Sequence, residues 1–381
     1  MGCCCCKKRQ EPINIVVSPE HFIDKKDIEK GKKLISLNDF EILKLIGKGT
    51  FAKVFLVRNK ANKKIYSMKK LNKPFIKQYK QEQHTINERI LLSKMDYPFL
   101  IKLYCCFQDQ EHLYFIMEFA QGGELFFHLH RETNFDDEKT RFYIAEIILA
   151  LNFLHKNKII YRDIKPENIL LDIDGHIKLT DFGLSKICSK SNEKAFTICG
   201  TPFYIAPEII EKKGYNSSVD WWSLGCLMYE MIHGKPLFNF TDAKINTKKY
   251  DEKIPFYNNF SEEAKDLISK LVVKEPDKRL GAGPNGFEDL KSHNYFKEIN
   301  WDDLENKKIT PPFEPIVNGP TDLRYFDKIF TEEVDITRDG GDGLNDGNKT
   351  IDNYVNFSYY DPNNISFNKN KQNLGNKKDK K

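Results

Sequence analysis

Short runs of hydrophobic and polar residues in the first part of the chain have the spacing of β-strands. Residues 40–46 and 54–57 are two such runs on either side of a glycine-rich turn, so they predict a β-hairpin. Further strands are predicted at residues 65–71 and 113–119. The charged stretch between them, residues 76–95, has the period of a helix.

Beyond Gly123 the spacing of hydrophobic residues becomes mainly helical. Helices are predicted at residues 124–130, 137–155, 219–233 and 262–273. Together these elements predict an α+β fold with two lobes. An antiparallel sheet would form the small lobe over residues 40–118, and helices would form the larger lobe over residues 119–296.

The two ends of the chain differ from this central domain. Residues 1–39 form a polar lead-in, and residues 297–381 form a tail. From Arg338 onward the tail is rich in Asn, Asp, Gly and Lys, which predicts disorder interrupted only by an aromatic patch at residues 354–360.

The composition of the 381 residues fits a folded enzyme, because 40% of them are hydrophobic and 13% are aromatic. The net charge of +5 is a small difference between 60 basic and 55 acidic residues, which are interspersed, so no nucleic-acid partner is expected. The longest apolar stretch, residues 144–154, contains Glu146 and Asn152, so no membrane-spanning segment is predicted. Five cysteines scattered between Cys105 and Cys226 lack metal-ligand spacing, which predicts reduced thiols in the cytoplasm.

The N-terminal sequence MGCCCCKKRQ predicts a lipid anchor. Gly2 would carry myristate, and the residues that would carry palmitate are Cys3, Cys4, Cys5 and Cys6. One myristoyl chain binds membranes only weakly, so acylated thiols and the adjacent basic residues would supply the second signal. A peripheral position on a membrane follows. Cysteine stands at position 6, where serine or threonine is usual, and a metal-binding or reactive cysteine cluster is the alternative.

The turn between the first two predicted strands is a candidate phosphate-binding loop. Small residues there let backbone amides approach phosphates without an intervening side chain. Hairpin turns are rich in glycine in many folds, so the turn alone is weak support. The candidate nucleotide-binding residues of this segment are Ile46, Gly47, Lys48, Gly49, Thr50, Phe51, Ala52, Lys53 and Val54.

Two charged residues after this turn are the next candidates. Lys69 stands at the end of a predicted strand, where its ammonium group would face the phosphates. Glu88, on the following predicted helix, would pair with Lys69 and hold it in position. Solvated surface charge is the alternative for either residue taken alone, and their order along the chain favours the pair.

The segments YRDIKPEN, residues 161–168, and DFG, residues 181–183, carry the decisive chemistry. Phosphoryl transfer needs a positioned hydroxyl, a carboxylate near it, and ligands that hold magnesium across the phosphates. Asp163 would orient the hydroxyl and accept its proton, and Lys165 would neutralise charge on the transferred group. The predicted oxygen ligands for Mg²⁺ are Asn168 and Asp181.

With these motifs in the expected order, residues 40–296 resemble the eukaryotic protein kinases. Residues 197–208, TICGTPFYIAPE, resemble the activation segment of the AGC group of serine/threonine kinases, and residues 220–225 and 278–281 continue the match. The resemblance implies an enzyme that uses ATP and Mg²⁺ to phosphorylate serine or threonine in protein substrates.

The resemblance also implies roles for residues outside these motifs. Glu208 and Arg279 would form a structural ion pair. The purine of ATP would meet the backbone of a hinge that runs from Met117 through Glu118 to Ala120. Apolar walls on either side of it would include Val54 and Leu170. Ser67 stands where the family usually has alanine, and Tyr161 where it usually has histidine; neither change should prevent ATP binding or catalysis.

Substrate recognition follows from the same resemblance. Glu124, Glu167 and Glu230 match acidic positions that recognise arginines two and three residues upstream of the acceptor, so a basic substrate is expected. Phe203 replaces the usual glutamate for a more distant arginine. The apolar pocket for the residue after the acceptor would be formed by Ile198, Pro202 and Ile205.

Activation by phosphorylation is the last implication. Thr197 is the predicted phosphosite, which an upstream kinase would modify, and the residues that would hold its phosphate are Arg162, Lys186 and His84. Residues 354–359, YVNFSY, resemble the hydrophobic motif of the AGC tail and would dock on the small lobe beside the Glu88 helix. Ser358 and Thr337 are candidate tail phosphosites. A disordered tail with unrelated aromatic residues is the alternative.

The sequence therefore predicts a phosphorylation-activated, membrane-anchored serine/threonine kinase with a monomeric catalytic unit. The main alternative is a membrane-tethered pseudokinase or scaffold that has the same fold. The presence of every predicted reactive residue favours the enzyme; these are Lys69, Glu88, Asp163, Asn168 and Asp181.

Overall fold

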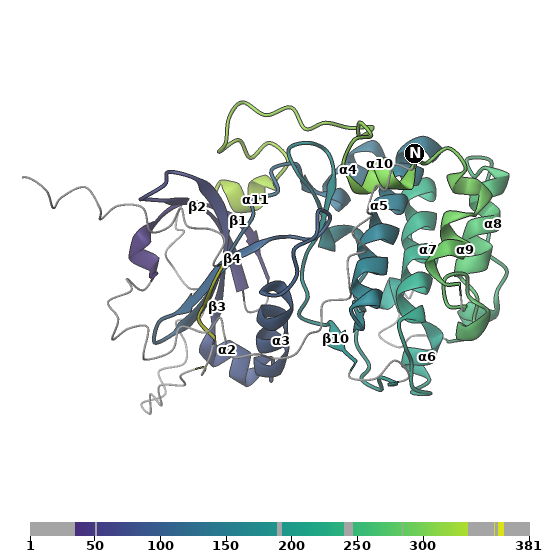
Figure 1. Ribbon diagram of the computed structural model, residues 1–381, viewed down its shortest axis with the longest axis horizontal. Helices are drawn as coiled ribbons and strands as arrows, with labels where there is room; N and C mark the ends of the chain where they lie inside the picture. The colour runs from purple at the N-terminus through teal and green to yellow at the C-terminus, as the bar shows by residue number, and fades with distance from the viewer. Residues whose placement is uncertain are drawn as a thin grey trace, which may run out of the picture.

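A computed structural model of the protein describes residues 35–49, 52–188, 193–239, 247–283, 285–333, 354 and 357–361. The predictions at Gly2, Cys3 to Cys6, Thr50, Phe51 and Thr337 lie outside these residues. The described chain forms two lobes, one built on a sheet and the other on helices (Figure 1). None of the described helices is long and apolar enough to cross a membrane.

The small lobe contains an antiparallel sheet of six strands in the order β1-β2-β3-β5-β4-β11. The strands are β1 (Phe40–Lys48), β2 (Ala52–Asn59), β3 (Ile65–Asn72), β4 (Leu103–Gln108), β5 (His112–Met117) and β11 (Tyr359–Tyr360). Strand β4 was not predicted from the sequence. Its side chains are buried on both faces of the sheet, so the alternation that marks a half-exposed strand is absent.

The single helix predicted for residues 76–95 is wrong, because the chain forms two helices there, α2 (Lys73–Gln78) and α3 (Glu82–Leu92). The side chain of Asn72 caps α2 by accepting a hydrogen bond of 3.1 Å from the backbone N–H of Phe75. Lys80 adopts a left-handed backbone conformation with φ of 53°, which ends α2 and lets α3 start in a new direction.

The large lobe contains the four long helices that the sequence predicted, with small changes in their bounds. These four are α4 (Leu125–Glu132), α5 (Asp137–Lys156), α7 (Ser218–His233) and α8 (Glu262–Leu271). Shorter helices, which were not predicted, are α6 (Pro207–Ile210), α9 (Phe287–Lys291) and α10 (Trp301–Glu305). Short 3-10 helices of this lobe are η3 (Pro166–Asn168), η4 (Pro202–Tyr204), η5 (Thr247–Asp251), η6 (Pro276–Lys278) and η7 (Asn294–Phe296). Another, η2 (Leu37–Asp39), directly precedes β1 of the small lobe. A further helix of the tail, α11 (Lys328–Thr331), contacts β1 of the small lobe (Figure 1).

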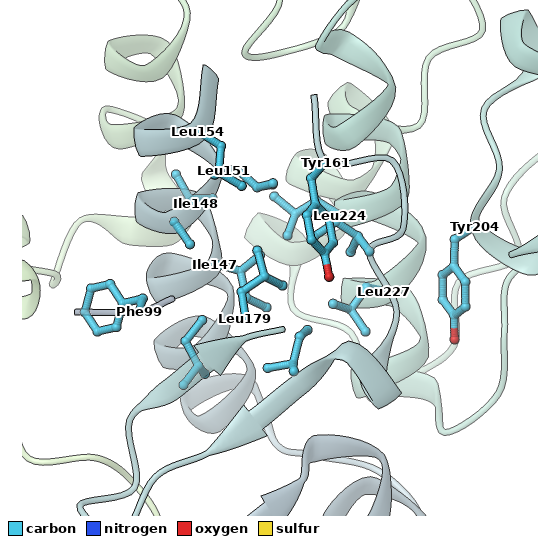
Figure 2. Close-up of a cluster of buried hydrophobic side chains, with 14 of the residues drawn as sticks. Phe99, Ile147, Ile148, Leu151, Leu154, Tyr161, Leu179, Tyr204, Leu224 and Leu227 are labelled. Atoms are coloured by element: carbon cyan, nitrogen blue, oxygen red, sulfur yellow. The ribbon is translucent and has the colours of Figure 1, made fainter. Parts of the chain in front are cut away.

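The core of the large lobe lies between α5 and α7. Figure 2 shows buried side chains from both helices, among them Ile147, Ile148, Leu151, Leu154, Leu224 and Leu227. Tyr161, which begins the predicted catalytic segment, is fully buried and belongs to the same cluster. The catalytic segment is therefore anchored in the close-packed core of the lobe.

Candidate active site

The predicted catalytic segment follows the short strand β7 (Ile159–Ile160), and α7 holds it in place. Asp220 of α7 accepts hydrogen bonds from the backbone N–H groups of Tyr161, at 3.0 Å, and Arg162, at 2.8 Å. These bonds fix the turn in which Arg162 adopts a left-handed conformation with φ of 73°. Strained backbone at this position requires such external support.

Asp163 is only 6% exposed, and three side chains contact its carboxylate. Asn168 Nδ2 lies 2.8 Å from Oδ2, Lys165 Nζ lies 3.0 Å from Oδ2, and Thr201 Oγ1 donates to Oδ1 at 2.9 Å. These contacts hold the carboxylate in one orientation. The structure therefore brings together Asp163, Lys165 and Asn168, as the sequence predicted, and adds Thr201 from the activation segment.

Lys69, Glu88 and Asp181 meet between the lobes. Lys69 Nζ lies 2.7 Å from Glu88 Oε1 and 3.7 Å from Asp181 Oδ1. Burial lowers the pKa of Lys69, but the charges of Glu88 and Asp181 outweigh this effect and raise the pKa above its usual value. The charge of Lys69 is also the main reason that the pKa of Asp181 is lowered. Lys69 is therefore a fixed positive charge, as the prediction required.

The glycine-rich turn lies between β1 and β2, and Val54 of β2 pairs with Lys69 of β3. Gly47 pairs with Val54 and Lys48 with Lys53 across the two strands. The N–H of Gly49 donates to the carbonyl of Ala52 at 2.8 Å, which closes the turn.

The predicted hinge leads from β5 to β6 (Gly123–Glu124), and strand β8 (Ile169–Leu171), which contains Leu170, pairs with β6. Met117 and Ala120 are buried there. The N–H of Glu118 donates to the carbonyl of Lys102 at 2.9 Å. The predicted hinge therefore connects the sheet of the small lobe to strands β6 and β8.

The three predicted acidic residues for substrate lie on the large lobe. Glu230 accepts a hydrogen bond from the Tyr204 hydroxyl, and burial raises its pKa to about 7, with a further contribution from Glu167. Loss of surrounding water and the carboxylates of Glu167 and Asp327 raise the pKa of Glu124 to about 7. Since Glu167 raises the pKa of both Glu124 and Glu230, the three carboxylates lie close enough to form one acidic cluster.

The residues predicted to contact the position after the acceptor have different environments. Ile205 is buried, whereas Pro202 is exposed and Ile198 is 51% exposed. The two exposed side chains are accessible to a peptide. Ile205 is buried, so it offers no free surface to a peptide.

The activation segment places Thr197 at the surface, and its carbonyl accepts a hydrogen bond of 2.7 Å from the Tyr215 hydroxyl. Arg162 donates to the same hydroxyl at 3.0 Å. Lys186, on strand β10 (Lys186–Ile187), pairs with Glu193 at 3.0 Å, and burial and the charge of Arg162 lower the pKa of His84. Arg162 is therefore linked to the backbone of Thr197 and lies near His84, whereas Lys186 contacts Glu193 and the carbonyl of Lys194.

Glu208 and Arg279 form the predicted structural ion pair. The guanidinium group donates to both carboxylate oxygens, at 2.9 and 3.2 Å, and the Arg279 side chain is fully buried. Tyr161 packs edge-on against Phe182, with 5.4 Å between ring centroids, and donates to the carbonyl of Thr180. The tyrosine thus has the packing role that the sequence suggested.

Sequence reasoning missed two residues that shape the site. Thr201 contacts Asp163, and Asp220 holds the catalytic segment. Both lie inside segments that carried the resemblance, but only the fold shows which atoms they contact.

The protein kinase domain family matches residues 40–296 of this chain. The serine/threonine-protein kinase Sgk1 of Xenopus tropicalis is 48% identical over 298 residues, which cover 78% of this chain and 71% of that protein. The RAC-beta serine/threonine-protein kinase A of Xenopus laevis is 47% identical over 307 residues, covering 80% and 63%. The RAC serine/threonine-protein kinase of Drosophila melanogaster is 48% identical over 309 residues, covering 81% and 51%.

These matches confirm the predicted α+β bilobal fold and the resemblance to the AGC group. The match covers most of the chain, and the reactive residues of the site lie within it. The chain belongs to the protein kinase family and is a protein serine/threonine kinase.

Proposed function

We propose that this kinase transfers the terminal phosphoryl group of ATP to serine or threonine in basic protein substrates, and that phosphorylation and a lipid anchor control it. The observation that supports the reaction best is the environment of Asp163. Its carboxylate is held by Thr201, Lys165 and Asn168 and lies on the same lobe as the acidic cluster. Asp163 would accept the proton of the substrate hydroxyl, and Lys165 would stabilise charge on the transferred group.

The residues present fit Mg²⁺ and ATP. Asn168 donates through Nδ2 to both the carbonyl and the carboxylate of Asp163. The amide oxygen of Asn168 therefore points away from Asp163. That oxygen and the half-exposed carboxylate of Asp181 are hard ligands of the kind that magnesium prefers. The metal would neutralise phosphate charge, and Lys69 would add a positive charge already fixed by Glu88.

The acidic cluster of Glu124, Glu167 and Glu230 supports a preference for arginine upstream of the acceptor. Burial and the nearby carboxylate of Glu167 disfavour the charged forms of Glu124 and Glu230, and a guanidinium group bound beside them would offset this effect. Tyr204 holds Glu230 in a fixed orientation. A basic peptide therefore fits this surface better than a neutral one.

The pH dependence of peptide binding tests this preference. Carboxyls with a pKa of about 7 are charged above that pH and neutral below it, so about nine tenths are charged at pH 8 and about one tenth at pH 6. Arginine stays charged at both values. We expect KM for an arginine-containing peptide to rise about tenfold from pH 8 to pH 6 in steady-state assays.

A peptide with alanine in place of the two arginines is the matched control, and its KM should change much less over the same range. Replacing Glu230 with glutamine should flatten the profile for the arginine peptide. If KM changed equally with pH for both peptides, the acidic cluster would not be the site that recognises arginine.

Phosphorylation of Thr197 is the proposed switch in the activation segment. Thr197 is exposed to an upstream kinase, and the Tyr215 hydroxyl links its carbonyl to Arg162. Lys186 pairs with Glu193, four residues before Thr197 in the chain. A phosphate would compete with Glu193 for Lys186 and would tie the segment to the catalytic turn through Arg162.

The tail supplies the second proposed control. Phe357 is 2% exposed, and its ring packs edge-on against Phe115 at 5.4 Å between centroids. Its carbonyl accepts a hydrogen bond of 3.0 Å from Arg89 Nε on α3, the helix that carries Glu88. Gln108 Nε2 donates to the carbonyl of Tyr354 at 2.9 Å. A docked tail would therefore stabilise α3 in the position in which Glu88 meets Lys69, and phosphate on Ser358 would lie next to Arg89.

Replacing Phe357 with alanine should remove this contact and lower kcat/KM at least about tenfold, because truncating a buried phenylalanine costs several kcal/mol, about 3 to 5. Ile316→Ala is the matched control, since Ile316 also lies in the tail but is 72% exposed. Peptide phosphorylation rates of purified proteins measure the difference. Full activity of Phe357→Ala would argue against control by the docked tail.

A lipid anchor at Gly2 and Cys3 to Cys6 is the proposed membrane attachment. The charge of the small lobe supports it, because residues 35–118 contain 15 lysines and arginines but 8 aspartates and glutamates. Such a lobe would be attracted to anionic lipids close to the anchor. Replacing Gly2 with alanine should move most of the protein from the membrane fraction to the soluble fraction of cells that perform myristoylation. Unchanged fractionation, together with zinc binding by the peptide of residues 1–10, would favour the metal-binding alternative.

A further inference from the structure

The hydroxyl group of Ser67 lies where strand β3 meets the hinge. Ser67 pairs with Met117 in the ladder between β3 and β5, and its side chain is buried, with the residue 8% exposed. Its Oγ lies 2.8 Å from the carbonyl oxygen of Glu118 and 3.4 Å from that of Met117. Both oxygens can only accept, so the hydroxyl must be the donor of a hydrogen bond to the hinge backbone.

Ser67 is on the face of β3 that points into the site. Side chains two residues apart in a strand share a face, and Lys69 extends from that face to Glu88 and Asp181. The Ser67 hydroxyl is therefore on the nucleotide side of the sheet. The other face of β3 carries Tyr66 and Met68, which belong to a separate hydrophobic cluster.

The backbone N–H and the side chain of Glu118 are held by contacts that do not involve Ser67. Its N–H donates to the carbonyl of Lys102 at 2.9 Å. Its carboxylate pairs with Lys178 at 2.9 Å and accepts from the N–H of Lys102 at 3.4 Å. Removing the Ser67 hydroxyl should therefore change the hydrogen bonding of the Glu118 carbonyl and leave its position unchanged.

We propose that Ser67 is a specificity-determining residue that weakens the preference of this kinase for purines with a 6-amino group over purines with a 6-oxo group. The proposal rests on the proposed function, in which the purine meets the hinge backbone. An amino group at position 6 of the purine would donate to the carbonyl of Glu118, which already accepts a hydrogen bond from Ser67. A carbonyl oxygen can accept two hydrogen bonds, but the second gains less than the first because the first has already met the cost of leaving the oxygen without a donor.

For a 6-oxo purine the effect has the opposite sign. Its oxygen would face the Glu118 carbonyl, and two acceptors repel each other. The proton of Ser67 lies at that carbonyl and reduces the repulsion. Alanine, which the family usually has at this position, would restore full discrimination in favour of the amino group.

Binding of the magnesium complexes of ADP and IDP to the full-length protein tests the proposal by calorimetry, without any need for catalysis. IDP differs from ADP in having oxygen at position 6 of the purine. We expect Ser67→Ala to increase the ratio of the two dissociation constants, Kd for IDP over Kd for ADP, about fivefold, which corresponds to one ordinary hydrogen bond. Ser67→Thr keeps a hydroxyl group and should stay within about twofold of wild type.

Ser93→Ala is the matched control. Its hydroxyl donates to the carbonyl of Ile90 at 2.9 Å at the end of α3, away from the hinge, so the ratio should not change. A ratio that is equal in Ser67→Ala and wild type would overturn the proposal, and so would equal weakening of both nucleotides, which indicates only a structural role. Failure of wild type to bind either nucleotide would instead overturn the proposed nucleotide site itself.

Discussion

Replacing Asp163 with asparagine is expected to lower kcat by at least about 100-fold, in the range found when a positioned proton acceptor is lost. Asparagine has nearly the same shape, but its amide cannot accept the proton of the substrate hydroxyl. The amide would also lose the charge that now attracts Lys165 at 3.0 Å. Since Asp163 does not take part in the Lys69 ion pair, nucleotide affinity should stay within a few fold of wild type.

Two measurements on the same preparations check this expectation: phosphorylation of an arginine-containing peptide and calorimetric binding of ADP with magnesium. Asp174→Asn is the matched control, because Asp174 pairs with Lys307 at the surface, 3.1 Å away, outside the site. Activity that survives in Asp163→Asn would rule out the proposed mechanism. Wild-type protein that binds nucleotide but has no turnover, even when phosphorylated, would favour the pseudokinase alternative.

Replacing Arg279 with methionine is expected to destabilise the protein by about 3 to 5 kcal/mol, because it leaves the carboxylate of Glu208 buried without its partner. Arg279 also donates to the carbonyl of Ser218 at 2.8 Å and to that of Val273 at 2.9 Å. Its guanidinium carbon lies 5.3 Å from the centre of the Trp222 ring. One side chain therefore connects η6, α6 and α7, and methionine can replace only its packing.

Urea unfolding followed by fluorescence measures this loss. Arg324→Met is the matched control, since Arg324 pairs with Asp322 at the surface and should contribute less than about 1 kcal/mol. The double variant Glu208→Gln with Arg279→Met should lose less than the sum of the single changes, because no charge remains buried alone. Single changes that each cost less than about 1 kcal/mol would contradict this role.

Elements with a strong local signal were predicted well from the sequence. The hairpin of β1 and β2 and the helices α5 and α7 were found because their hydrophobic residues follow one period over many positions. Strand β4 was missed because burial on both faces removes that period. The break between α2 and α3 was missed because it depends on the backbone conformation of Lys80, and lysine has no special preference for that conformation.

The tail was also predicted only in part from the sequence. Its aromatic motif was visible in the sequence, and docking beside α3 was predicted. Its pairing as an edge strand was not predicted, although Tyr359 and Tyr360 extend the sheet by joining Cys106 and Cys105 of β4. The partner strand of β11 was itself unrecognised, and a two-residue strand has too few positions to show a period.

The sequence by itself determined the kinase chemistry of this protein, because Asp163, Lys165 and Asn168 lie within one short segment whose spacing is set by the covalent chain. Only the tertiary structure decided which distant groups complete that segment. Thr201 reaches Asp163, Asp220 holds the catalytic turn, and Ser67 donates to the hinge. Each of these contacts joins residues that are far apart in the sequence, and their distances follow from how the elements within each lobe pack rather than from any local pattern.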